Sequence, residues 1–92
     1  MNVTIKYMAQ IKVTAGVAEE TLDLADPCSV SDLLRQLTEK HHPGLRPMLL
    51  DESGRLQPTI LLFVNDSQVQ DTDAAMLANG DVVTFLSPIA GG

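Results

Sequence analysis

The chain has 92 residues and a net charge of −6 at pH 7, from 12 acidic and six basic side chains. Hydrophobic residues make up 45% and charged residues 20% of it, a balance typical of one small globular domain and not of a disordered segment. The basic residues are dispersed, which argues against a nucleic-acid surface. The apolar runs are too short to cross a bilayer, and the first residues lack a signal-peptide pattern. We therefore expect a cytoplasmic protein with no nucleic-acid or membrane partner.

The first half of the chain predicts two strands and one helix. Residues 3–7 alternate apolar and polar side chains, as do residues 21–24, so we expect these segments to pair as a hairpin with a long, loose connection. Ser29 is a good helix N-cap, and apolar residues then follow at i, i+3, i+4 and i+7 spacing. This helix is expected to run to about Lys40 and to stop at Pro43-Gly44.

The second half predicts a loop followed by strands. Residues 44–59 read as a long loop, with at most a short turn at residues 48–50. Residues 60–64 are apolar on both faces, which predicts a central strand covered on both sides or nearly so. Three short elements are expected to follow: a returning strand at 68–70, one helical turn at 74–78 and a last strand at 81–86.

This order of elements predicts an α+β roll. A hairpin, a right-handed helical crossover and a second hairpin-like pair is the layout of the β-grasp, or ubiquitin-like, fold. We expect a mixed sheet of four to five strands with one main helix across one face. The predicted organisation is one β-grasp domain over residues 1–87 and a flexible C-terminal diglycine tail over residues 88–92.

The sequence ends in Gly91-Gly92, directly after an expected strand and Pro88. Two residues without Cβ atoms leave the carboxylate of Gly92 unshielded on a thin chain, which can enter a narrow channel in another protein. We therefore expect Gly92 to be the functional end. The tail inserted into a partner is expected to comprise Pro88, Ile89, Ala90 and Gly91.

Phe85 and Leu86 belong to the last expected strand. Both side chains suit a core, and we also consider them for an exposed apolar surface that binds a partner.

Other reactive side chains predict no further site. Cys28 has no second cysteine with which to pair. We expect it to be a small, partly buried residue that precedes the helix. His41 and His42 are adjacent, so on a helix they point about 100° apart and cannot readily share a metal ion. We expect no catalytic residue and no metal site.

Several short motifs, in this order, resemble the small subunit of molybdopterin synthase, MoaD, and the MoaD/ThiS superfamily of sulfur carriers. The resemblance lies in Ile5 to Gln10 with Ala15 to Glu20, Phe63 to Asp66, Asn79 to Val83, and the ending Leu86 to Gly92. It spans the chain except for residues 43–59.

This resemblance implies a protein cosubstrate and not an enzyme. In that superfamily a ubiquitin-activating-type enzyme uses ATP to adenylate the terminal carboxylate, which a sulfur donor then converts to a thiocarboxylate. Gly92 would carry the sulfur, no cofactor would be bound to the chain, and the large molybdopterin synthase subunit would accept the sulfur.

Two alternatives to this role stay open. Residues 1–4, the extended middle loop and residues 64–66 also resemble CysO-type carriers, which supply a cysteine synthase-like enzyme. A ubiquitin-like modifier joined to lysines through Gly92 would begin with the same adenylate.

Overall fold

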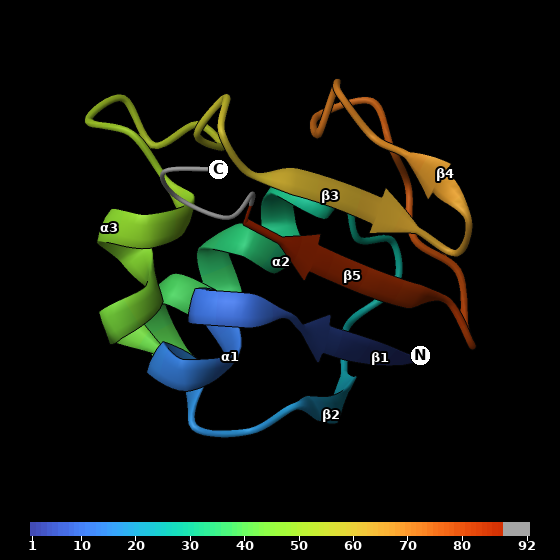
Figure 1. Ribbon diagram of the computed structural model, residues 1–92. Helices are drawn as coiled ribbons and strands as arrows, with labels where there is room; N and C mark the ends of the chain where they lie inside the picture. Colours follow the sequence, from blue (N-terminus) through green and yellow to red (C-terminus); the bar gives the residue numbers. More distant parts are fainter. Residues whose placement is uncertain (88–92) are drawn as a thin grey trace.

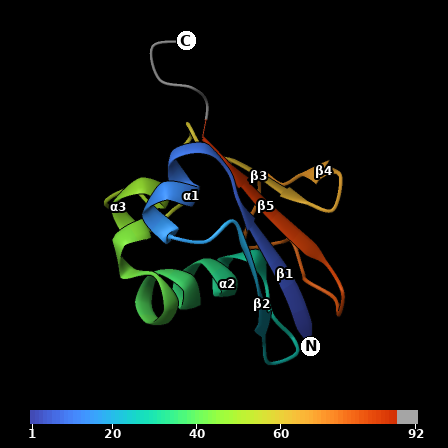
Figure 2. The ribbon, with the colours of Figure 1, turned by 60° about the horizontal axis from the view of Figure 1, so that its bottom comes forward.

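The computed structural model describes residues 1–87, which form a five-stranded sheet in the order β2-β1-β5-β3-β4. The strands are β1 (Asn2–Tyr7), β2 (Glu19–Asp23), β3 (Leu61–Val64), β4 (Ser67–Gln68) and β5 (Val82–Leu86). β1 and β5 are parallel, whereas every other neighbouring pair is antiparallel. Figures 1 and 2 show the helices on one side of this sheet. The α+β roll with a mixed β-grasp sheet is therefore confirmed.

The core lies between the sheet and the helices. Because successive strand residues point to opposite faces, every second side chain of β1 and β5 turns inward. Five of these inward side chains are almost completely buried: Val3, Ile5, Tyr7, Val83 and Phe85. Full burial of one such apolar side chain stabilises the fold by about 1.5–3 kcal/mol.

The main helix forms where the sequence predicts it. α2 (Val30–Gln36) begins with a capping box, in which the Ser29 hydroxyl accepts from the Asp32 N–H and the Asp32 carboxylate accepts from the Ser29 N–H. A π-helical segment, Leu37–His41, continues α2 as far as His41. The expected end near Lys40 is thus confirmed.

The expected loose connection in the first hairpin is wrong, because α1 (Ala9–Ala15) occupies it. The helix buries Ile11 and ends at Gly16, which has a φ of 81°. The expectation of a loop after Pro43 is also wrong in part. A 3₁₀ turn, Pro43–Leu45, and α3 (Arg46–Leu49) bury Leu45 and Leu49, four residues apart on one face.

The position predicted for the strand near residues 60–64 needs a correction. β3 is second from the edge, and β5 is the central strand. Leu62 points into the core, whereas Leu61 and Phe63 point to the opposite face of the sheet and are only partly covered. Within residues 1–87, no second layer of structure covers that outer face of the sheet. The helical turn expected at residues 74–78 is not helical, since residues 72–74 form turns and Met76 bridges to Ser29.

Candidate functional site

The end of β5 is the part of the described structure that comes directly before residues 88–92 in the sequence. β5 is central and ends at Leu86, and Ser87 is the last described residue. Tyr7 pairs with Phe85, so the parallel strands β1 and β5 end at the same edge. The expected tail, residues 88–92 with Gly92, lies outside the described residues, and its role stays a prediction.

One of the two residues expected at a partner surface is in the core. Phe85 is 0% exposed and its ring stacks on Tyr7, with ring centroids 6.2 Å apart. It therefore adds nothing to an exposed surface. Leu86 points to the outer face of the sheet and is partly exposed, as its expected role requires.

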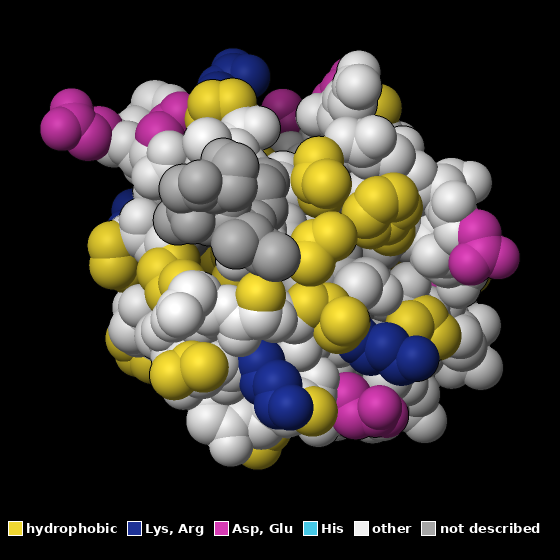
Figure 3. All heavy atoms as spheres, in the orientation of Figure 1, with side chains coloured by type: hydrophobic (Ala, Val, Ile, Leu, Met, Phe, Trp, Pro, Cys, Tyr) yellow, Lys and Arg dark blue, Asp and Glu magenta, His cyan; other side chains and the backbone are white. Residues whose placement is uncertain are grey.

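Leu86 belongs to an apolar patch at the exit edge of the sheet. Leu61 lies directly opposite Leu86, and Phe63 lies opposite Thr84. On the other side of β5, the pairing of Tyr7 with Phe85 places Met8, which is 46% exposed, beside Leu86. We call Met8, Leu61, Phe63 and Leu86 the exit patch. Figure 3 shows hydrophobic side chains gathered over β3 and β5 on this face. An exposed apolar cluster of this kind is typical of a protein-binding surface.

A polar cluster lies beneath the same edge, on the helix side. The Tyr7 hydroxyl donates to Glu20 Oε2 at 2.7 Å, and His42 Nε2 shares that oxygen. The Tyr7 ring also meets the His42 ring edge to face, with centroids 5.5 Å apart. This cluster joins β1, β2 and the residue after the π-helical segment, and so it holds β1, the parallel neighbour of β5, in place.

The pKa shifts in the cluster follow from its geometry. Burial, followed by the hydrogen bond and the negative charge of Glu20, raises the pKa of Tyr7 well above its usual range. Burial raises the pKa of Glu20, but the hydrogen bonds from Tyr7 and His42 and the nearby positive charge outweigh it, so the pKa of Glu20 is lowered overall. Tyr7 therefore stays protonated and Glu20 stays ionised at neutral pH, which suits a structural role.

Glu20 is held inside the fold by Tyr7 and His42, and no motif in the sequence marks it for this role. Its position two residues before the buried Leu22 in one strand places both side chains on the inner face, but its partners Tyr7 and His42 are distant in sequence.

Cys28 lies in the core before α2 at 2% exposure, which is deeper than the partly buried position expected for it. Burial and then the charge of Asp32 raise the pKa of its thiol, so it is a poor nucleophile at neutral pH. Within residues 1–87, no three His, Cys, Asp or Glu side chains are grouped to hold a metal ion. No helix in that range is long and apolar enough to span a membrane.

Comparison with known proteins decides the family. The model of the ThiS family matches residues 5–92, which include both terminal glycines. The chain belongs to the ThiS family. Relatives in this group are named as sulfur carriers and as ubiquitin-like modifiers.

Three relatives show the range of the group. A molybdopterin synthase sulfur carrier subunit from Chlamydomonas reinhardtii is 30% identical over 92 residues, covering 100% of each chain. Small archaeal modifier protein 3 from Haloferax volcanii is 30% identical over 94 residues, again with 100% of each chain covered. The sulfur carrier protein CysO from Mycobacterium bovis is 31% identical over 98 residues with the same coverage.

Solved structures confirm the ubiquitin-like fold. Small archaeal modifier protein 1 from Haloferax volcanii has a TM-score of 0.90 at 24% identity, covering 100% of both chains. Ubiquitin-related modifier 1 (Urm1) from Trypanosoma brucei has a TM-score of 0.79 at 28% identity, covering 99% of this chain and 95% of that one. CysO in complex with BexX from Amycolatopsis orientalis has a TM-score of 0.74 at 25% identity, covering 98% of this chain and 99% of that one.

Proposed function

We propose that this protein is a sulfur carrier whose Gly92 carboxylate is adenylated by a partner enzyme and then converted to a thiocarboxylate. The observation that carries the proposal is the match of the ThiS family model through Gly92. The exit patch supports it, because a partner that docks on Met8, Leu61, Phe63 and Leu86 would lie beside the strand that leads to the tail.

The chemistry needs a partner because a carboxylate is ionised and unreactive at neutral pH. A carboxylate oxygen attacks the α-phosphate of ATP, pyrophosphate leaves, and an acyl-adenylate forms. A sulfide donor then attacks the carbonyl carbon, the bond to AMP breaks, and the thiocarboxylate remains on Gly92. The carrier binds no cofactor itself, and a reactive sulfur atom stays attached to a protein until an acceptor enzyme takes it.

Molybdopterin synthesis is the acceptor pathway we favour. The Chlamydomonas carrier subunit matches this chain end to end over 92 residues. The large subunit of a molybdopterin synthase would then be the acceptor partner, and this chain its small non-catalytic subunit. A CysO-type role is the runner-up, since the relative with that name is 31% identical over its whole length.

Modification of lysines is a second candidate function. It is favoured by relatives named as modifiers, one of them 30% identical over the full length of both chains. The same adenylate would end in an amide bond between Gly92 and a lysine amine.

Intact mass spectrometry tests the carrier proposal. The chain is incubated with its cognate activating enzyme, ATP and sulfide, and we expect the mass change of one oxygen-to-sulfur exchange. A Cys28→Ala variant should still acquire the sulfur, because the acceptor is Gly92, whereas a chain lacking Gly91 and Gly92 should not. Sulfur that follows Cys28, or a product found only as lysine adducts with a Gly-Gly remnant, would overturn the proposal.

A further inference from the structure

One asparagine of this chain is followed by a glycine. Asn79 precedes Gly80, whereas Asn2 and Asn65 precede residues that carry a Cβ atom. Because glycine has no Cβ, its backbone nitrogen can approach the side-chain amide of the residue before it more closely than that of any other residue. The pair Asn79-Gly80 is therefore the place in the chain where an asparagine side chain reacts most readily with the backbone.

The reaction open to this pair is deamidation. The backbone nitrogen of Gly80 loses its proton to base and attacks Cγ of Asn79. The bond from Cγ to the side-chain amino group breaks, ammonia leaves with the proton, and a five-membered succinimide ring forms. Water then opens the ring at either of its two carbonyl groups, which leaves an aspartyl or an isoaspartyl residue at position 79.

In the folded chain, the backbone of Asn2 holds both reacting groups. The Asn2 N–H donates to Asn79 Oδ1 at 2.8 Å, and the Gly80 N–H donates to the Asn2 carbonyl at 2.7 Å. Figures 1 and 2 show the loop before β5 lying beside the start of β1. The attacking nitrogen thus keeps its proton in a hydrogen bond, and the side-chain amide is held in place by another.

The turn around the pair is closed as well. The Asp81 N–H donates to the Ala78 carbonyl at 3.1 Å, and Gly80 has a φ of 89°, which the third position of a type II turn requires. The Asp81 carboxylate accepts from the Ala78 N–H at 2.8 Å, and its carbonyl accepts from the Thr4 N–H at 3.0 Å. Formation of the ring needs rotation of the backbone at Asn79, and this network of hydrogen bonds resists that rotation.

Solvent can reach the pair as soon as these bonds open. Asn79 and Gly80 are both exposed. Asn2 is the first residue of β1, and the ends of an element open at a lower free energy than its centre. One local opening, between the start of β1 and the turn, would free both reacting groups at once.

We propose that Asn79-Gly80 is a deamidation site, which the fold keeps unreactive through the backbone of Asn2 and which reacts when the start of β1 separates from this turn. The isoaspartyl product carries the chain through the former side chain, which lengthens the turn by one carbon atom and adds a negative charge near Asp81. Such a turn no longer matches Asn2, so the product marks chains in which this join has opened. The inference does not depend on the sulfur-carrier proposal, because no step involves Gly92.

Ageing of the full chain at mildly alkaline pH tests the proposal. The chain is kept either folded or in urea above its denaturation midpoint, and is then digested with trypsin. Cleavage after Arg55 is the last along the chain, so one peptide, residues 56–92, holds both Asn65 and Asn79. Tandem mass spectrometry reads the amide-to-acid exchange at each position. We expect Asn79 to react at least about tenfold more slowly in the folded chain than in the unfolded one.

Two variants at one position isolate the backbone of Asn2. Asn2→Pro removes the N–H that holds Asn79 and leaves the carbonyl, at the first position of a strand, where proline is tolerated. Asn2→Ala keeps both backbone groups and is the matched control. We expect Asn79 to react at least about threefold faster in folded Asn2→Pro than in folded Asn2→Ala. Asn65, which lacks a glycine after it, should react far more slowly than Asn79 in the unfolded chain.

Two outcomes would overturn the proposal. Equal rates at Asn79 in the folded and the unfolded parent chain would mean that the fold does not protect the site. Equal rates in folded Asn2→Pro and Asn2→Ala would mean that the backbone of Asn2 does not control it. Circular dichroism melts show that each variant is folded, and the comparison within the parent chain stands without either variant.

Discussion

Glu20 shows how one side chain links pH to the stability of the tail-bearing edge. Its pKa is lowered below the ordinary 4.5 in the folded protein, so the stability it contributes is present above that value and is lost as the pH falls through the folded pKa. We expect Glu20→Gln to lower the free energy of unfolding by about 1–2 kcal/mol near pH 7, because Tyr7 and His42 lose a charged acceptor. The difference from the parent should shrink as the pH falls below 4.5. Urea denaturation across pH measures it, with the exposed Glu19→Gln as a control expected within about 0.5 kcal/mol of the parent. A difference that stays constant with pH would contradict this role for Glu20.

At the scale of the element, α1 depends on how it ends. Gly16 has a φ of 81° and donates its N–H to the Lys12 carbonyl at 2.9 Å, in the left-handed conformation that disfavours a side chain. An added Cβ would meet nothing within 4 Å, so Gly16→Ala isolates the backbone effect, and we expect a loss of about 1–2 kcal/mol. Gly44→Ala is the matched control, since its Cβ would make an ordinary contact with Thr14 at 3.7 Å and its φ is not positive. Urea denaturation compares the two, and equal costs would show that the left-handed cap is unimportant.

The same elements show how far the sequence could predict this molecule. α2 was predictable because Ser29 caps it and a long apolar stripe follows. α1 and α3 were not, because helices of one or two turns that bury Ile11 or Leu49 take their stability from tertiary packing and leave little periodicity. The apolar run at β3 could not distinguish a strand covered on both faces from one with an exposed apolar face. The partners of Glu20 lie 13 and 22 residues away, which local patterns do not reach.

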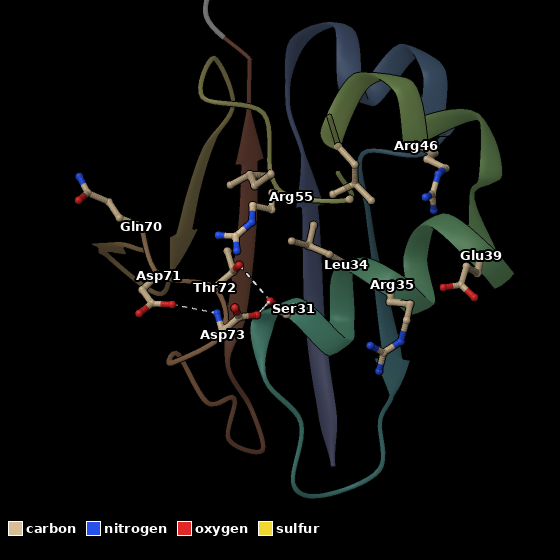
Figure 4. A pocket seen from close by; sticks show the side chains of 13 residues that line it. Ser31, Leu34, Arg35, Glu39, Arg46, Arg55, Gln70, Asp71, Thr72 and Asp73 are labelled. Atoms are coloured by element: carbon tan, nitrogen blue, oxygen red, sulfur yellow. Dashed lines mark hydrogen bonds between the residues drawn. The ribbon is translucent and has the colours of Figure 1, made fainter. Parts of the chain in front are cut away.

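At the scale of the whole molecule, the exit patch lies on the outer face of the sheet and the exposed Arg46 and Arg55 lie on the helix side (Figure 4), so changes at the two places should act independently. If an activating enzyme docks on the exit patch, Leu86→Asp places a charge in an apolar contact that must lose its water, and we expect KM for the carrier to rise about tenfold with kcat unchanged. Thr4→Asp adds the same charge to the outer face beside Val82, at the other end of β5 from Leu86, and Arg46→Gln with Arg55→Gln changes only the helix side. Both variants should therefore leave KM within about twofold. Pyrophosphate release at varied carrier concentration measures these constants. Equal KM changes for Leu86→Asp and Thr4→Asp would mean that the enzyme responds to net charge, and a fall in kcat alone would mean that Leu86 positions the tail without contributing to docking.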